Sequence, residues 1–178
     1  MPFTPFHFGP GLFGKTLVSR HFSWSAFIAS QVIIDFETLY FLIQRTYPIH
    51  RFFHTFVGAF IAAWTTVVIL VLIRNVLHKL EPALAGYIDR LRPSLTSEFS
   101  TTGLIIGALA GGLSHPLLDG IMHPDVHPFA PWSDANPFLG VISVEYLHLS
   151  CLLLGLIGFI LEAMRLRRER TRRGKTWA

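Results

Sequence analysis

Long apolar segments separated by short polar ones make up most of the chain. Three of the apolar segments are long enough to cross a lipid bilayer as helices: residues 52–77, 101–121 and 141–164. A fourth segment, from Trp24 to Ile43, is equally long, although it contains Asp35 and Glu37. The pattern predicts an all-α, polytopic membrane protein, a bundle of about four transmembrane helices.

The composition agrees with a membrane protein. Hydrophobic residues make up 51% of the 178 positions and charged residues only 15%, which is too apolar for an ordinary soluble domain. Residues 1–23 are interrupted by prolines and glycines, so we expect a re-entrant or interfacial segment that does not span alone. We therefore expect a membrane-embedded helical domain over residues 1–164 and a basic cytoplasmic tail over residues 165–178.

The distribution of basic residues predicts the orientation in the membrane. With four spans and a cytoplasmic C-terminus, thirteen of the 15 lysines and arginines fall on the cytoplasmic side. The other two, Arg45 and Arg51, fall on the outer side. A basic segment directly after a span is more often a topology signal in contact with lipid headgroups than a nucleic-acid arm. We therefore expect the bilayer as a partner and no nucleic acid.

The third span and the connection before it carry two further patterns. Residues 74–100 are polar, which predicts an exposed connection with an amphipathic helix around residues 82–91. In the span itself, small residues recur every four positions at Gly103, Gly107 and Gly111. Such a ladder predicts that a neighbouring helix approaches closely.

The segment that follows this ladder concentrates side chains capable of chemistry. Residues 111–128 contain three histidines and two aspartates. His115 and Asp119 are four residues apart and share one face of a helix, and Pro116 between them is expected to kink or restart it. Imidazole and carboxylate groups are ligands of zinc and related divalent metals. The structural alternative is that Asp119 caps the helix and the histidines lie at the lipid headgroup boundary.

Other acidic and histidine residues fall at the same end of the predicted bundle. Carboxylates within a span, such as Asp35 and Glu37, usually face the bundle interior or a water-filled cavity. His7 falls at the inner end unless the N-terminal segment enters the bundle. The predicted topology brings the following residues towards the outer end: Asp35, Glu37, His50, His54, His115, Asp119, His123, Asp125, His127, Glu145 and His148.

Four short motifs occur in an order that resembles a known family. They are Pro5-Phe6-His7, Ile34-Asp35-Phe36-Glu37, His50-Arg51-Phe52-Phe53-His54-Thr55 and Ser114-His115-Pro116-Leu117-Leu118-Asp119. Through them, roughly residues 1–160 resemble the metal-dependent hydrolases of the bacterial inner membrane, of the LexA-binding type. More distantly, the order of histidines and aspartates is similar to that of the zinc-dependent phospholipase C and P1 nuclease class.

The resemblance implies a site, an activity and a location. It implies a divalent metal, zinc in the more distant class, that activates water to attack a phosphoester or acyl bond. A site at the outer face of the bacterial inner membrane suggests a lipid or lipid-linked substrate. By this likeness, the metal ligands would be His7, Asp35, His54, His115 and Asp119, with Asp119 bridging to a second metal.

Three further residues would then take part in catalysis. Glu37 or Asp125 would act as general base if it reaches the attacking water. Arg51 would hold a phosphate through two parallel hydrogen bonds. The weaker candidates for a second ion, or for orienting the ligands, are His50, His123 and His127.

The sequence departs from the pattern of these families in three places. Ile34 stands where a proline is expected, and the second acid of that motif is Glu37 rather than an aspartate. Near the fourth span, Glu145 and His148 occur in the reverse order of the His-x-x-x-Glu motif of the phospholipase class. These departures argue against a full three-metal cluster.

Two other functions are compatible with the sequence. A transporter or an ion- or proton-conducting protein also uses buried carboxylates and histidines, as relays. The absence of an inverted repeat between the two halves of the sequence argues against this class. A non-enzymatic membrane scaffold, whose basic tail recruits a cytosolic partner, would need no metal.

Overall fold

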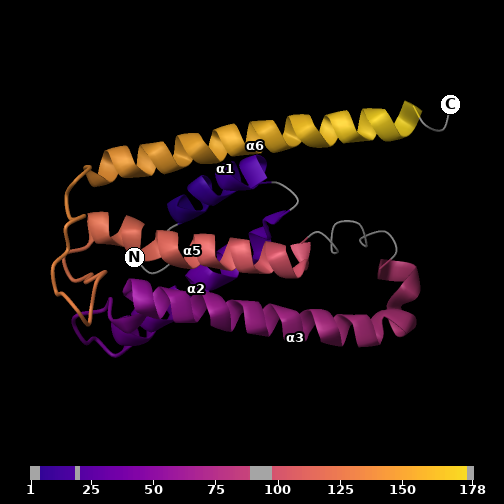
Figure 1. The fold of residues 1–178 in the computed structure, drawn as a ribbon. Helices are drawn as coiled ribbons and strands as arrows, with labels where there is room; N and C mark the ends of the chain where they lie inside the picture. The colour runs from indigo at the N-terminus through magenta and orange to yellow at the C-terminus, as the bar shows by residue number, and fades with distance from the viewer. Residues whose placement is uncertain (1–4, 19–20, 89–97, 176–178) are drawn as a thin grey trace.

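The computed structural model describes residues 5–18, 21–88 and 98–175 (Figure 1). Over these residues the chain is all-helical, as the sequence predicts, and contains no strand. Two 3-10 turns, η1 (Pro5–His7) and η3 (Phe52–His54), precede α1 and α3 respectively. The α-helices are α1 (Phe8–Val18), α2 (Trp24–Ile43), α3 (Phe56–Ile88), α5 (Thr101–Met122) and α6 (Val144–Lys175).

Four of these helices are long and apolar enough to cross a membrane, which confirms the predicted number of spans. The segments concerned are Trp24–Ile43, Phe56–Leu80, Thr101–Met122 and Val144–Arg168. The expected exposed connection is wrong in its first part, because α3 continues to Ile88. A helix that leaves the bilayer keeps its internal hydrogen bonds in water, so the end of the apolar segment does not end the helix. Residues 82–88 of the predicted amphipathic helix belong to α3, and residues 89–91 lie outside the described residues.

The backbones of α2 and α5 lie almost in contact. The amide of Ser23 donates a hydrogen bond to the carbonyl oxygen of Gly103 at 3.0 Å, so the two helices begin side by side and run parallel. A Cβ atom added at Gly107 would lie 2.1 Å from the carbonyl oxygen of Ser23. One added at Gly111 would lie 2.3 Å from the carbonyl oxygen of Phe27. The glycine ladder therefore permits the close helix approach that the sequence predicts.

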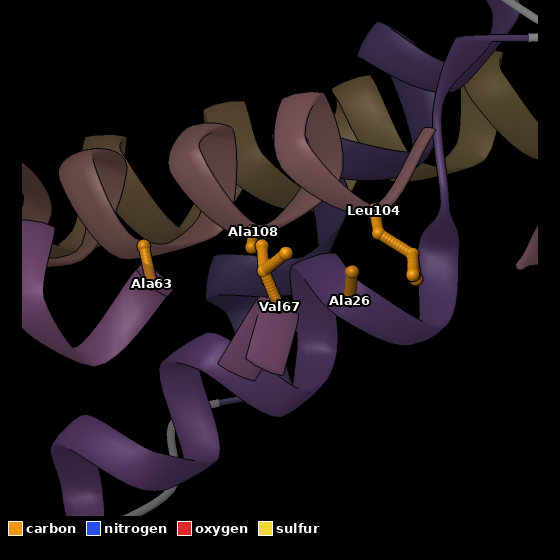
Figure 2. Close-up of a cluster of buried hydrophobic side chains, with 5 residues drawn as sticks. All are labelled: Ala26, Ala63, Val67, Leu104 and Ala108. Atoms are coloured by element: carbon orange, nitrogen blue, oxygen red, sulfur yellow. The ribbon is translucent and has the colours of Figure 1, made fainter. Parts of the chain in front are cut away.

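The apolar core between α2, α3 and α5 consists mostly of small side chains. Its buried members are Ala26 from α2, Ala63 and Val67 from α3, and Leu104 and Ala108 from α5 (Figure 2). Lipid tails are as apolar as these side chains, so helix association in a membrane depends on close packing rather than on exclusion of water. The small residues bring the three helices close enough for that packing.

The last span, α6, joins the bundle chiefly through the short helix α1, which lies between α6 and the other helices (Figure 1). A Cβ atom at Gly9 of α1 would lie 1.9 Å from the carbonyl oxygen of Cys151 in α6. On its other side, α1 is tied to the segment before α5 by an ion pair between Lys15 and Glu98. The N-terminal segment is thus packed within the bundle, and most of the apolar surface of α6 is left exposed for lipid.

We expect Gly107→Ala to destabilise the bundle and Gly14→Ala to leave it unharmed. The added methyl group at position 107 meets backbone, which cannot move away as a flexible side chain would, whereas position 14 has nothing within 4 Å. Overpacking of this kind costs about 1–3 kcal/mol. The thermal unfolding midpoint of each variant, measured in the same detergent, tests this, and equal midpoints would contradict the packing described.

Candidate metal centre

Four side chains from three separate elements converge at one end of the bundle. Asp35 of α2, His54 of η3, and His115 and Asp119 of α5 place one donor atom each within 4.8 Å of one another. The Nε2 atom of His115 lies 3.1 Å from Oδ2 of Asp119 and 3.4 Å from Oδ1 of Asp35. The Nε2 atom of His54 lies 3.3 Å from the same Oδ2 of Asp119. All four side chains are buried, so this group could hold a metal ion.

The parallel packing of α2 and α5 explains why these side chains meet. The helices start together at Ser23 and Gly103, and Asp35 and His115 each lie twelve residues further along. His115 and Asp119 then share one face, as their spacing predicts. α5 runs through Pro116 as a single helix, so the helix does not restart there as one alternative expected.

His115 lacks the hydrogen bonds that buried polar atoms normally make. Both of its ring nitrogens are buried without a hydrogen-bond partner. Nε2 of His115 is within 3.1 Å of a carboxylate oxygen, but it is not directed at that oxygen as a hydrogen-bond donor. Unpaired buried polar atoms cost about 1–3 kcal/mol each. Nitrogens and carboxylate oxygens that face a common point fit a tetrahedral cation such as Zn²⁺.

His7 is carried to this group by the N-terminal segment, as the sequence resemblance implies. Its side chain is 2% exposed, and its Nε2 atom lies 3.4 Å from Oδ1 of Asp119. Its ring meets that of His115 edge to face, with centroids 5.0 Å apart. Burial lowers the pKa of His7 to about 4 even though the Asp119 carboxylate opposes the shift, so the ring is neutral at physiological pH. Neutral imidazole is the form that binds metals.

Glu37 lies on the opposite side of the His54 ring from the four-residue group. Its Oε2 atom is 3.6 Å from Nδ1 of His54 and accepts hydrogen bonds from the amides of Arg51 and Phe53, at 3.3 and 2.9 Å. A carboxylate at the distal nitrogen of a metal-binding histidine fixes the orientation of its ring. The geometry favours this positioning role for Glu37, and its role as general base stays a prediction.

The two other residues expected to act in catalysis lie outside the four-residue group. The guanidinium of Arg51 lies 3.7 Å from the ring centroid of Phe41, and its Nε donates to the carbonyl oxygen of Pro48 at 2.8 Å. Arg51 is exposed, and binding of a phosphate there stays a prediction. Asp125 is buried and belongs to a second group of potential ligands, with His50 and His123.

The remaining candidates from the sequence are distributed around the site. His127 is in neither ligand group, and its Nδ1 atom lies 2.6 Å from the carbonyl oxygen of Asp134. Glu145 is exposed, whereas His148 stacks on Phe6 with ring centroids 4.5 Å apart. The predicted gathering of histidines and acids at one end therefore includes residues that do not take part in either group.

Sequence reasoning missed two buried polar residues of α2. The hydroxyl oxygen of Thr38 lies 3.4 Å from Nε2 of His54, and the side-chain amide of Gln31 is buried without a hydrogen-bond partner. Gln31 lies four residues before Asp35 and Thr38 three residues after it, so both are on the face of α2 that carries this aspartate. The helical spacing around Asp35 was the signal that could have identified them.

If the four-residue group holds a divalent metal, we expect Glu37→Gln to weaken its binding without preventing folding. Glutamine retains an oxygen that accepts the two backbone amides but removes the negative charge next to His54. Loss of such an orienting carboxylate typically reduces metal affinity about 10–100-fold. Competition with a chromogenic chelator measures the affinity, and Glu145→Gln, which changes an exposed acid, is the matched control. Equal affinities in the two variants would show that Glu37 does not orient the ligand.

Comparison with known proteins identifies the family but no activity. No curated protein and no solved structure matches the sequence. The family described as a domain of unknown function, DUF4184, matches residues 1–177. Because the match covers almost the whole sequence, the chain belongs to the DUF4184 family.

Proposed function

We propose that this protein is a membrane-bound, metal-dependent hydrolase. The observation that carries the proposal is the convergence of Asp35, His54, His115 and Asp119, with both ring nitrogens of His115 buried and without hydrogen bonds. Two imidazoles and two carboxylates are a donor set typical of zinc in proteins. The order of motifs that resembles inner-membrane hydrolases agrees with this interpretation.

The residues at this site suit the activation of water. When bound, the ion supplies Lewis-acid activation of water and of a phosphoryl or acyl oxygen. His54 and His115 would hold it through nitrogen, and Asp35 and Asp119 through oxygen, with His7 adjacent. Glu37 would fix the ring of His54. Asp125 is engaged by His50 and two loop amides, and its role as general base stays a prediction.

The surroundings of the site support a lipid or lipid-linked substrate. The loops at this end carry the exposed aromatic side chains of Tyr47 and Trp132, and the first turn of α6 carries Tyr146; they are 73%, 80% and 68% exposed. Tyrosine and tryptophan are enriched where a membrane meets water. The loops after α2 and α5 meet at the end of the bundle where the ligand groups lie (Figure 1). Such a site would meet the headgroup region of the bilayer.

The arrangement favours hydrolysis over transport. A relay places titratable groups along a path through the membrane. Among the described residues, the buried histidines and acids lie in the second halves of α2 and α5, in the loops that follow these helices, in η3 and in η1. They are His7, Asp35, His50, His54, His115, Asp119 and Asp125.

The proposed location is the bacterial inner membrane, with the C-terminus in the cytoplasm and the site at the outer face. The thirteen-to-two distribution of basic residues supports this orientation. Two of the thirteen basic residues on the proposed cytoplasmic side, Lys15 and Arg74, have contacts that place them in the structure. Lys15 pairs with Glu98, and Arg74 donates to the carbonyl oxygen of Phe99, so both lie at the start of α5, opposite the site.

We expect protein purified without chelators to retain zinc or a similar divalent metal, and the double variant His115→Ala/Asp119→Ala to lose it. Elemental analysis measures the content, with His21→Ala, which changes an exposed histidine at the opposite end, as control. Retention should decrease as the pH falls. Burial opposes protonation of His54, but the carboxylates of Asp119 and Glu37 raise its pKa, so protons compete with the ion. A metal-free wild-type protein would refute the proposal.

We expect a reporter that works only in the cytoplasm to be active when it is fused after Ala178. We also expect Ser133→Cys to react with a membrane-impermeant thiol reagent added from outside. Ser133 is exposed in the loop before α6, whereas the native Cys151 is buried and should react little. Labelling of intact and lysed cells separates the two orientations. An exterior C-terminus would reverse the placement of the site.

A further inference from the structure

We propose a second divalent-cation site formed by His50, His123 and Asp125, directly beside the four-residue group. Each of the three residues offers one donor atom, and these atoms lie within 4.8 Å of one another. The inference deepens the proposed function, because it gives the same centre two adjoining ions. It rests, however, on residues that are separate from the first ligand set.

The end of α5 supplies one wall of both sites. One face of this helix carries a residue of interest every four positions: His115, Asp119 and His123. The first two belong to the four-residue group, called the inner group from here on, and His123 lies next along the same face. The amide of His123 donates to the carbonyl oxygen of Asp119 at 2.8 Å, which extends the helical hydrogen bonding to this residue. The position of His123 is therefore fixed by the helix that carries the inner ligands.

The loop between α2 and η3 supplies the opposite wall. Oδ2 of Asp125 accepts hydrogen bonds from the amides of Ile49 and His50, at 3.2 and 3.3 Å. Oδ1 of the same carboxylate lies 2.9 Å from Nδ1 of His50. These contacts join residues 75 positions apart in the sequence and hold the His50 ring in place. Asp125 and His50 are 7% and 4% exposed.

The two groups adjoin through ring contacts. The His50 ring lies 4.4 Å from that of His123 and 4.6 Å from that of His54, centroid to centroid. His50, a member of the second group, thus contacts His54 of the four-residue group directly. His123 is partly exposed, whereas His54 and His115 are 0% and 1% exposed, so the second site is nearer to solvent.

The donor set and the exposure define what the second site would bind. Two imidazoles and one carboxylate leave coordination positions open, as in metal sites that also take water or substrate. The chemical class is a divalent cation such as Zn²⁺ or Co²⁺, and its open positions would accept an anionic oxygen of the substrate.

Titration of the detergent-purified, metal-stripped protein with Co²⁺ tests the proposal, with bound cobalt measured by elemental analysis and visible absorption. Wild type should bind about two ions per chain, the outer one more weakly. His123→Ala and Asp125→Asn should each bind about one, and His127→Ala, outside both groups, should still bind about two. Asparagine at position 125 keeps an acceptor for the two backbone amides, which preserves the fold of the loop.

The outcomes separate this inference from the proposed function. If wild type binds about one ion and His115→Ala abolishes it, the second site does not exist but the inner centre remains. If His123→Ala and Asp125→Asn both bind as many ions as wild type, the second ion lies elsewhere and the assignment is wrong. If wild type binds no cobalt and no zinc, both the second site and the hydrolase proposal fail.

Discussion

The close approach of the α2 and α5 backbones is the constraint on which the rest of the structure depends. Gly107 and Gly111 have no side chain between these helices, so the carbonyl groups of α2 lie directly on α5. Because the helices run parallel and advance by the same number of residues, Asp35 arrives beside His115. A slip of one residue would turn one of these side chains by about 100° around its helix axis. The packing of the two helices therefore determines whether the ligand group can form.

The electrostatics of the same end follow from that packing. Asp35 and Asp119 are buried in a segment apolar enough to lie in a membrane, where an ionised carboxylate needs a positive partner. The nearby cationic side chain of Arg51 rests on Phe41, at the protein surface. Histidines surround the two aspartates instead, and they neutralise the carboxylates only by taking up protons or by sharing a metal ion with them.

Much of the fold could be predicted from sequence, because spans are defined by hydropathy and length. The ends of α3 and α6 could not, since no bilayer limits a helix once it has left the membrane. Within the site, the pair His115 and Asp119 follows from helical spacing alone. The placement of Glu37 behind His54, and the link between His50 and Asp125, depend on how distant loops fold, which no local pattern encodes.

The position of α1 has a consequence for biogenesis. His7 lies in η1, directly before α1, and α1 packs chiefly on α6, which follows every other described helix in the sequence. During co-translational insertion, α1 therefore gains its main packing partner only when α6 has been made. The inner ligand group can assemble from α2, η3 and α5 alone, but His7 joins it only after α6 has entered the membrane. Completion of the site is thereby coupled to the insertion of α6.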